Sequence, residues 1–538
     1  MTAEPGILNA SAGVIDVVLG VDLGTTATKV VAFDVHGQEH ASSSAGYPLL
    51  EPSPGEAVQD PAEITAAALR AIRAVTAELP PGAVVRAVSF SSALHSLVGV
   101  DADGVALTPS ITWADIRANK QADRLRTSGK GLELQLRTGT PTHPMSPLTK
   151  LMWFREEDPE LHARVATWAG IKEVVVHALT GEWVTDHSVA SATGLFNLRS
   201  RSWDREALEL AGVGPERLPR LVATTYAGLR PLPAVAAELG LPADVPLVVG
   251  GGDGPLANLG IGAVKPGVAA CSVGTSGALR VVVESPSVDP QGRVFCYALT
   301  EDRWAVGGAI TNGGVAVRWA GDTMAPELEE LAPELGDSPV EPVLDLAASV
   351  PPGCGGLVML PYLLSERAPH WTSVPSAAYV GLTRAHGRAH LVRATLEGIC
   401  QQLALVLDSM RAAGNEVHEV RATGGVFASR LWRQTLADVL GMPVSFAKGH
   451  EGSSFGAALL GMQAVGLVES VDAAEALIEI EEVVAPDPAA VSVYATLRPL
   501  YSEVYAALLP AFARIRELEE SLPLAYSEPA EPQELAED

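Results

Sequence analysis

The sequence predicts an α/β protein of two similar domains that enclose a cleft. Its 538 residues exceed the roughly 150 residues of an ordinary domain, so two cores are expected. Short β-branched runs alternate with longer stretches of helical periodicity, which is typical of α/β layers. One strand–turn–strand motif also occurs twice, once near the start of each half, which indicates duplicated domains.

The first copy of the motif occupies residues 17–35 and predicts a hairpin. A β-branched strand ends in the carboxylate of Asp22, and a Gly-Thr-Thr turn leads into a second strand. Backbone N–H groups of such a turn, with the hydroxyls of Thr25 and Thr26, can face phosphate oxygens. Asp22 can hold magnesium, which prefers carboxylates, waters and phosphate oxygens. Taken alone, the segment fits an ordinary hairpin with a polar turn better.

The second copy, residues 269–283, repeats the plan with a Gly-Thr-Ser turn that contains Thr275. Two phosphate hairpins, one in each half, are what a nucleotide clamp between similar domains requires. No Gly-Lys-Ser or Gly-Lys-Thr follows a suitable glycine loop, so a Walker A site is excluded. The duplicated hairpin therefore predicts a nucleotide-binding cleft of another class.

The other elements of the first half follow in chain order. Residues 57–79 predict a helix with proline at an early position, and residues 84–100 predict an interrupted strand. Further helices follow up to about residue 180, and residues 247–260 predict a strand that runs into a glycine loop and a helix start. The domain boundary is expected around residues 262–267, just before the second hairpin. The expected division is a flexible tail over 1–15, domains over 16–262 and 263–516, and an acidic, disordered tail over 517–538.

The second half continues the alternation of loops, helices and strands. Residues 304–319 predict a small-residue loop, residues 325–347 an acidic and partly helical segment, and residues 390–412 an amphipathic helix. Residues 420–428 predict a strand that leads into two glycines, and residues 431–440 and 453–466 predict two further helices. In the amphipathic helix, Arg393 and Glu397 have the spacing of an i, i+4 ion pair.

Composition limits the partners of the protein. The formal net charge is −27, which argues against nucleic acid and anionic membranes because both need basic surface. No apolar run has the length of a membrane span, and the N-terminal segment lacks the basic residues of a signal peptide. The four cysteines are too widely spaced for a metal knuckle or a redox motif, so reduced thiols in a cytoplasmic protein are expected. A small-molecule substrate remains as partner, and a homodimer stays open.

Asp253 is the candidate catalytic base. It follows a strand, lies in the glycine loop 250–254 and begins a predicted helix, and glycines let a substrate approach the backbone. A kinase that acts on an alcohol needs a carboxylate to accept the hydroxyl proton. By itself, Asp253 fits a turn or a helix cap better.

In the order and spacing of these motifs, the chain resembles the FGGY carbohydrate kinases, two-domain sugar and polyol kinases of the actin-like ATPase (ribonuclease H-like) fold. The resemblance extends from about residue 17 to residue 505. It implies ATP and Mg²⁺, Asp253 as the general base, and Asp22 with Asp253 as metal ligands. Because this base must be ionised, activity is expected to fall at acid pH.

The resemblance also implies a set of nucleotide contacts, in which hairpin hydroxyls meet phosphates and glycines let a flat base lie against the backbone. These residues are Thr25, Thr26, Lys29, Thr275, Gly314, Arg318, Gly424, Gly425 and Ser429. A solvated strand lysine is nearly as good an interpretation of Lys29.

On the substrate side, Trp113, Asp115 and Arg117 match a Trp-x-Asp-x-Arg segment of the family. An indole can pack on the C–H face of a sugar while the carboxylate and guanidinium bond hydroxyls. The alternative is a core tryptophan beside a surface ion pair. Leu94 and His95 stand where many sugar kinases of the family have Gln-Met-His-Gly, and this departure argues against a xylulose pocket.

Residues 138–151, together with 93–97, resemble the gluconate kinases of the same family. Gluconate carries a carboxylate, which needs a cationic or N–H-rich pocket, and His95, Arg117 and His143 are the expected suppliers. The neighbouring acid and base Glu366–Arg367 are expected to form a structural pair. The alternatives are a kinase for xylulose, ribulose or glycerol, and a non-catalytic nucleotide and sugar sensor.

Overall fold

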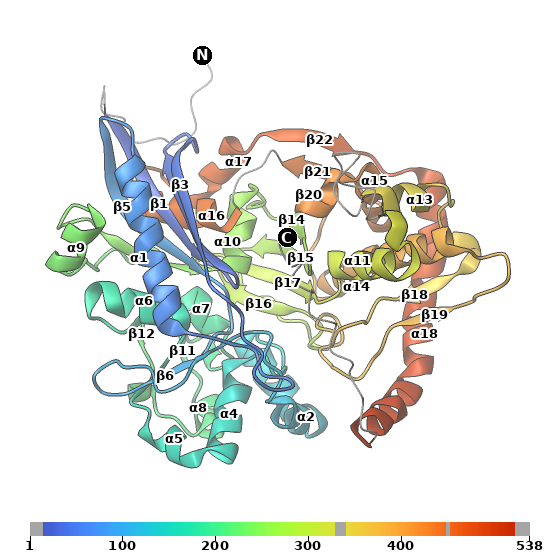
Figure 1. Ribbon diagram of the computed structural model, residues 1–538, viewed down its shortest axis with the longest axis horizontal. Helices are drawn as coiled ribbons and strands as arrows, with labels where there is room; N and C mark the ends of the chain where they lie inside the picture. Colours follow the sequence, from blue (N-terminus) through green and yellow to red (C-terminus); the bar gives the residue numbers. More distant parts are fainter. Residues whose placement is uncertain (1–13, 329–340, 448–451, 522–538) are drawn as a thin grey trace, which may run out of the picture.

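The computed structural model describes residues 14–328, 341–447 and 452–521 (Figure 1). The predicted N-terminal tail, up to residue 13, and the acidic tail beyond residue 521 lie outside the described residues, as does part of the predicted acidic segment 325–347. Two β-sheets organise the described chain, one in each half. No helix within these ranges is long and apolar enough to cross a membrane.

The first sheet has the strand order β13-β5-β1-β2-β3. Its strands are β1 (Ile15–Leu23), β2 (Ala27–Asp34), β3 (Glu39–Gly46), β5 (Ala83–Ser92) and β13 (Leu247–Gly252). The first three strands form an antiparallel meander, whereas β5 runs parallel to both β1 and β13. The carboxyl ends of β1, β5 and β13 therefore meet at one edge of the sheet, and the candidate site lies there.

Helices from both halves of the chain cover the first sheet. One face packs on α1 (Pro61–Glu78) and α6 (Ile171–Thr180). The other face packs on α10 (Asp253–Gly260) and on α16 (Gly452–Ala464), which comes from the second half of the sequence. The approach is close enough that a Cβ on Gly20 would lie 2.0 Å from the carbonyl oxygen of Ser454. A boundary near residue 262 divides the sequence but does not divide this packing.

The second sheet has the strand order β16-β17-β15-β14-β20-β21-β22. Its strands are β14 (Val268–Val273), β15 (Gly277–Val283), β16 (Phe295–Ala298), β17 (Trp304–Ile310), β20 (Glu419–Thr423), β21 (Val444–Ala447) and β22 (Ile480–Val484). Its main core is shared with five helices of the same half. These helices are α11 (Gly314–Met324), α13 (Glu341–Ala348), α14 (Arg388–Ala412), α15 (Arg430–Leu440) and α18 (Pro488–Ser521).

Short elements lie between β5 and β13 in the sequence, and most of them build the lower-left lobe of Figure 1. They are β6 (Val98–Val100), β7 (Ser110–Ile111), α2 (Asn119–Thr127), α3 (Lys130–Thr138), α4 (Pro147–Glu157), α5 (Pro159–Arg164), β8 (Thr167–Ala169), β9 (Val184–Asp186), α7 (His187–Ser191), β10 (Phe196–Asn197), β11 (Ser202–Trp203), α8 (Arg205–Ala211), η1 (Pro215–Arg217), β12 (Arg220–Val222) and α9 (Pro233–Leu239). The remaining elements are β4 (Val58–Gln59), η2 (Cys354–Gly356), β18 (Val358–Leu360), β19 (Ala378–Val380), η3 (Gly425–Ala428), η4 (Val471–Ala473) and α17 (Ala474–Leu477).

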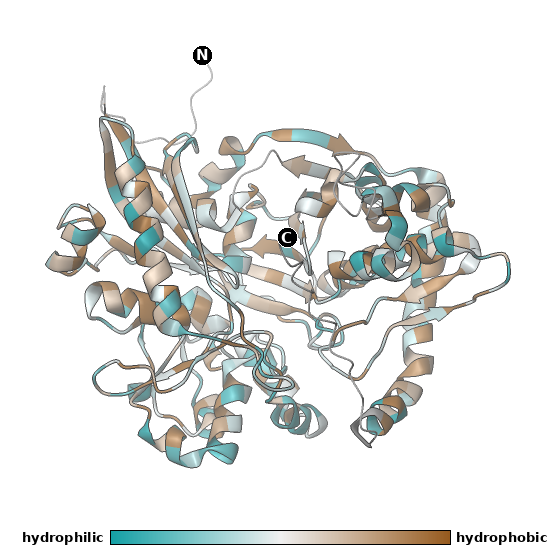
Figure 2. Ribbon diagram, in the orientation of Figure 1, coloured by the Kyte–Doolittle hydropathy of each residue, from teal (hydrophilic) through white to brown (hydrophobic). Residues whose placement is uncertain are grey.

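Both predicted hairpins form, as β1–β2 and β14–β15, and their strands follow the β-branched runs of the sequence. The predicted ion pair of α14 also forms, with 2.8 Å between Arg393 Nε and Glu397 Oε1. Figure 2 shows hydrophobic residues along the strands of both sheets and hydrophilic residues on the outer helices. The four cysteines are buried and free.

Two local predictions were wrong. Gly307 and Gly308 lie within β17 and not in a loop. Glycine is needed at position 307 because a Cβ there would approach the carbonyl oxygen of Leu279 to 2.1 Å. These glycines mark close approach inside a sheet, a use that looks like a turn in sequence. Disorder was also expected from residue 517, but residues 517–521 belong to α18, which ends at Ser521.

Candidate active site

Two adjoining cavities border the turn of the second hairpin, and the larger one lies where the halves of the chain meet. The first, of about 340 Å³, is lined by residues from both halves, and we call it the cleft cavity. The second, of about 310 Å³, is lined by the second half alone, and we call it the glycine cavity. Gly274 and Thr275, at the turn of the second hairpin, line both cavities. A ligand in one cavity can therefore meet a ligand in the other at this turn.

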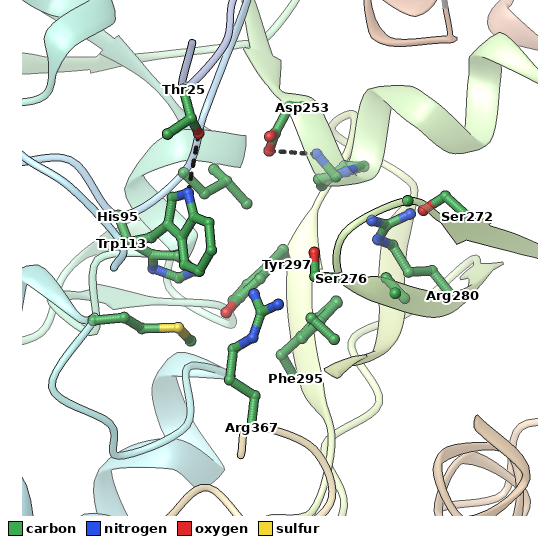
Figure 3. A pocket seen from close by; sticks show the side chains of 18 of the residues that line it. Thr25, His95, Trp113, Asp253, Ser272, Ser276, Arg280, Phe295, Tyr297 and Arg367 are labelled. Carbon is green, nitrogen blue, oxygen red and sulfur yellow. Dashed lines mark hydrogen bonds between the residues drawn. The ribbon is translucent and has the colours of Figure 1, made fainter. Parts of the chain in front are cut away.

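Asp253 faces the cleft cavity from the start of α10 (Figure 3). The preceding strand ends in three glycines, and Gly250 has a φ of 72°, which lets β13 come so close to β5 that a Cβ would meet the Phe90 carbonyl oxygen at 1.7 Å. The backbone N–H of Gly254 donates to Asp253 Oδ1 at 2.6 Å. The glycine loop thus places one carboxylate at a helix start and in a cavity.

The surroundings of Asp253 raise the pKa of its carboxyl group toward neutrality. Burial raises its pKa, and the nearby Asp22 carboxylate raises it further. The Arg280 guanidinium and the Gly254 N–H oppose both effects, and the pKa is about 6. Such a carboxylate is ionised at neutral pH and still basic enough to take a proton.

Arg280, on β15, lines the cleft cavity beside Asp253 and was not predicted as a site residue. Its Nη1 is buried and has no hydrogen-bond partner in the part of the chain that the structure describes. The signal in the sequence is a lone arginine inside the apolar run Ala278–Val283, because a charge there needs a partner or a ligand.

Side chains hold the turn of the first hairpin. Trp113 Nε1 donates to Thr25 Oγ1 at 3.1 Å, and Gln59 Nε2 donates to the Thr25 carbonyl oxygen at 2.6 Å. Thr25 lines the cleft cavity, whereas Thr26 is exposed beside it. Asp22 Oδ2 accepts a hydrogen bond from Ser453 Oγ of α16 at 2.9 Å.

Lys29 lies on β2, in register with Asp22 on β1. It is half-buried and lines neither cavity. Contact between Lys29 and a phosphate stays a prediction.

Leu94 and His95 both line the cleft cavity, as the sequence predicts. His95 has a left-handed φ of 69°, and its Nδ1 lies 2.8 Å from the Ala192 carbonyl oxygen. Burial and the Lys150 ammonium lower the pKa of His95 to about 3, so the ring is neutral. Nδ1 then carries the proton and donates to the carbonyl, which leaves Nε2 as an acceptor for a substrate hydroxyl. His95 supplies no positive charge.

Lys150 is buried and connects the loops that carry His95 and Trp113. Its Nζ donates to the carbonyl oxygens of His95 at 2.6 Å, Thr112 at 2.7 Å and Ile111 at 3.1 Å. Burial lowers the pKa of Lys150 to about 7, while the three acceptors match the three N–H donors of an ammonium group. Lys150 therefore joins the His95 loop to the loop that presents Trp113.

His143 is buried behind the cleft cavity and does not line it. Its Nδ1 accepts the backbone N–H of Met145 at 3.2 Å, and its ring packs edge-on against Trp371 at 6.0 Å. Burial and the nearby Arg367 and Arg126 hold its pKa well below the usual range. The expectation that His143 contributes a charge or an N–H group to the substrate pocket is corrected, because the neutral ring lies behind the wall formed by Met145 and Trp371.

Of the Trp-x-Asp-x-Arg segment, only Trp113 lines the cleft cavity. Asp115 is buried, accepts the backbone N–H of Ala57 at 3.1 Å and binds Arg117 at 2.8 Å. The Arg117 guanidinium lies 4.8 Å over the Trp153 ring and pairs with Glu56. Asp115 and Arg117 therefore hold the loop. The Arg117 guanidinium is paired with Asp115 and Glu56 and does not line the cleft cavity.

Arg367 enters the cleft cavity from the second half of the chain. Glu366, the expected structural partner of Arg367, is buried and is the main charge that favours the ionised guanidinium; it also accepts backbone N–H groups of Thr311 and Arg367 and the side-chain amide of Asn312, at 2.8, 2.8 and 3.0 Å. The Arg367 guanidinium lies 5.0 Å over the ring of Trp113.

Phe295 and Tyr297 form the neighbouring wall of the cleft cavity from β16, with their rings stacked at 4.3 Å. Neither aromatic residue was predicted in the site. Their β-strand alternation indicates one shared face but not which face meets a ligand.

The glycine cavity contains most of the predicted nucleotide contacts. Thr275, Gly314, Arg318, Gly425 and Ser429 line it, together with Gly274, Val315, Glu341, Leu344, Val426, Ala428 and Trp432. Gly424 does not line it. Its φ of 131° lets the chain turn where a Cβ would lie 1.9 Å from the Val273 carbonyl oxygen.

Two comparisons with domain models cover most of the chain. Residues 17–260 match the N-terminal domain of the FGGY family of carbohydrate kinases. Residues 269–465 match the C-terminal domain of the same family.

Similar proteins match over nearly their whole length. A gluconokinase of Bacillus subtilis (strain 168) is 38% identical over 505 residues, which cover 94% of this chain and 98% of that protein. A xylulose kinase of Staphylococcus epidermidis is 30% identical over 495 residues, which cover 91% and 96%.

Among solved structures, a gluconate kinase from Lactobacillus acidophilus has a TM-score of 0.87 at 33% identity and covers 93% of this chain and 100% of its own. A ligand-bound xylulose kinase from the same organism has the same TM-score, the same identity and the same coverage of both chains. These likenesses confirm the predicted two-domain α/β fold.

Proposed function

Because the chain belongs to the FGGY family of carbohydrate kinases, we propose that it phosphorylates D-gluconate with ATP, giving 6-phospho-D-gluconate and ADP. The observation that carries the proposal is a single carboxylate, Asp253, in a cavity that adjoins a second, glycine-lined cavity. Phosphoryl transfer to an alcohol needs this arrangement, with a base at the hydroxyl and a nucleotide beyond it.

In the proposed reaction, Asp253 accepts the proton of the C6 hydroxyl while that oxygen attacks the γ-phosphorus of ATP. Its pKa of about 6 makes the ionised form available at neutral pH. Arg280 beside it lowers the pKa of Asp253 and so favours the ionised base. Thr25 and Thr275, one from each hairpin, border the same space and supply hydroxyl donors.

The residues at this point suit a magnesium ion. The Asp22 carboxylate raises the pKa of Asp253, and a cation held by these two carboxylates would relieve their repulsion. The described residues contain no group of three or more His, Cys, Asp or Glu side chains suited to a metal. That fits Mg²⁺, which takes one or two carboxylates and completes its shell with water and phosphate oxygens. When bound, it would neutralise phosphate charge.

The adenosine of ATP is proposed to occupy the glycine cavity. Gly314 and Gly425 leave the backbone open to a flat base, and Arg318 is exposed at the wall to meet phosphate or ribose. Thr275 lines both cavities, so the phosphate chain can pass this residue toward Asp253.

Gluconate is preferred over xylulose on two grounds. The gluconokinase relative is more similar than the xylulose kinase relatives, at 38% against 30% identity over nearly the same span. The cleft cavity also contains two arginines, Arg280 and Arg367, and only one carboxylate, Asp253, which favours an anionic substrate. The ligand-bound xylulose kinase structure keeps a ketose as the second candidate.

A coupled ADP-release assay with ATP and magnesium tests the proposal. Gluconate, xylulose, ribulose, glycerol and a blank without sugar are offered in parallel. Turnover with gluconate well above the others supports the proposal. Turnover with xylulose alone would reject gluconate but keep Asp253 as base, and nucleotide binding without turnover on any substrate would favour a sensor.

A further inference from the structure

A sugar acid in the cleft cavity needs a partner for its carboxylate, and the three suppliers expected from the sequence do not provide one. His95 is neutral, His143 is neutral and behind the wall, and Arg117 is paired with Asp115 and Glu56. Burying an unpaired carboxylate is strongly unfavourable. The cation must come from another part of the wall.

Tyr297 presents an unused donor at this wall. Its side chain is buried, and its hydroxyl has no hydrogen-bond partner among the residues that the structure describes. Buried hydroxyls are nearly always paired, so an unpaired one that faces a cavity indicates a ligand. Burial raises the pKa of Tyr297, so the hydroxyl keeps its proton and acts as a donor. Stacking on Phe295 and an edge contact of 5.9 Å with His95 fix the ring.

Arg367 lies beside that hydroxyl, and Figure 3 shows the two groups facing the same space. Its Nε and Nη2 donate to Thr311 Oγ1 at 3.3 Å and to the Ile310 carbonyl oxygen at 2.9 Å. The remaining N–H groups have no partner in the described chain, and the guanidinium plane is steadied over Trp113. A held guanidinium with free N–H donors is well suited to a carboxylate.

The two arginines of the cavity serve different ends of it. Arg280 lies beside Asp253, at the proposed point of phosphoryl transfer. Asp253 is the main charge that favours the ionised form of Arg280. For Arg367, the buried Glu366 carboxylate is the main charge that favours the ionised form, and Asp253 contributes less. In Figure 3, Asp253 lies at the upper edge of the group, with Tyr297 and Arg367 below it.

We propose that the Tyr297 hydroxyl and the Arg367 guanidinium together bind the C1 carboxylate of a sugar-acid substrate, at the end of the cleft cavity away from Asp253. The inference rests on the proposed gluconate kinase function and adds to it the residues that separate an aldonic acid from a neutral polyol. The carboxylate accepts one hydrogen bond from the hydroxyl and others from the guanidinium. Trp113 lies between this subsite and the first hairpin.

The test compares D-gluconate with D-glucitol, which has the same chain hydroxyls but CH₂OH in place of the carboxylate. Steady-state kinetics are measured for the wild type, Tyr297→Phe and Arg367→Lys. Tyr297→Phe removes one donor, keeps the stacked ring and breaks no hydrogen bond in the described structure, so it should fold. We expect kcat/KM for gluconate to fall by about 10- to 100-fold, mainly through KM, because a hydrogen bond to a charged group is lost.

The same variant should change kcat/KM for glucitol by less than about two-fold, since no carboxylate is present to lose a partner. Arg367→Lys keeps the charge but loses the planar fork, so its gluconate-to-glucitol ratio should also fall. Tyr379→Phe is the matched control: its hydroxyl bonds Thr395 Oγ1 at 2.6 Å, outside both cavities, and the ratio should not change.

The outcomes separate the inference from the function on which it rests. If the wild type phosphorylates gluconate but Tyr297→Phe keeps the wild-type ratio, the subsite is wrong and the gluconate kinase function stands. If the wild type uses gluconate and glucitol equally, no carboxylate subsite exists. If it acts only on neutral sugars, both proposals fail. A drop for Tyr379→Phe equal to that for Tyr297→Phe would also overturn the subsite.

Discussion

The two hairpins have the same sequence plan but differ in charge and in what holds them. In the first, Asp22 ends β1, and side chains of Gln59 and Trp113 hold the turn at Thr25. In the second, Ser272 takes the place of Asp22, and backbone N–H groups around the start of α11 bond the carbonyl oxygens of the turn. The repeat therefore preserves the backbone while only the first copy carries the carboxylate.

The register of the two hairpins differs by one residue. Leu23 pairs with Thr28 in the first hairpin, whereas Val273 pairs with Gly277 in the second, so the second turn is one residue shorter. A slip of one residue moves every side chain of a strand to the opposite face. Arg280 thus pairs opposite Ala270 and lies on the face that meets α10 and Asp253.

The comparison explains the charge pattern around Asp253. An acid on the first hairpin raises its pKa, and a base on the second hairpin lowers it. Five variants, taken from the largest expected effect to the smallest, test the two hairpins and the side chains around them.

Asp253→Asn removes the group on which both hairpins act and should have the largest effect. We expect kcat to fall by about 10²- to 10⁴-fold, because general base catalysis is lost. Nucleotide binding, measured by calorimetry, should persist because the glycine cavity is unchanged. Wild-type turnover in this variant would disprove the role of Asp253.

The same variant should be more stable above pH 6. The pKa of Asp253 is raised by folding from 3.8 to about 6, so its ionisation opposes folding above pH 6 and has no effect below pH 3.8. A shift of this size corresponds to about 3 kcal/mol at most. Thermal melts at pH 8 should show a higher Tm for Asp253→Asn, with the gain vanishing near pH 4.

Asp22→Asn and Ser272→Ala test the unequal charge at matched positions. Since loss of even an outer metal partner lowers affinity by about 10- to 100-fold, Asp22→Asn should raise the magnesium requirement at least that much. Ser272→Ala should leave it unchanged. A magnesium titration of initial rates measures both, and equal effects would mean that the hairpins share the metal.

Lys150→Met tests the side-chain support on the first-hairpin side. It leaves the carbonyl oxygens of His95, Ile111 and Thr112 without their donor, at a cost of about 1–3 kcal/mol for each. We expect a lower Tm and a KM for sugar that rises several-fold while the KM for ATP stays constant. Equal changes in both KM values would indicate general loosening of the protein instead.

Arg280→Met should give the smallest change at alkaline pH and a clear one at acid pH. Without the guanidinium, the pKa of Asp253 rises above 6, so the acid limb of the rate profile should move up by about one pH unit. Asp22→Asn should move the same limb down, because a like charge is removed. Profiles of kcat/KM for sugar against pH show both shifts, and a limb that moves in neither variant would belong to another group.

Residues that act through local backbone geometry could be predicted from the sequence. The glycines around Asp253 and the paired Gly-Thr turns indicate tight turns at strand ends, and Asp253, Thr25 and Thr275 all reach the cleft cavity. Asp115 and Arg117 show the limit, because a motif position does not tell which side of a loop faces a ligand. Asp115 and Arg117 pair with each other, and Arg117 also contacts Glu56 and Trp153, which only the folded chain brings beside it.

The sequence by itself determined the two-domain α/β plan, both hairpins and the carboxylate at the start of α10, because strand alternation and glycine turns depend on neighbours in the chain. Only the tertiary structure decided the cations of the cavity. Arg280 depends on a one-residue slip in register, and Arg367 lies more than 250 residues from Trp113, over which it packs. It also decided that His95 and His143 are neutral, since desolvation of a group is set by everything packed around it.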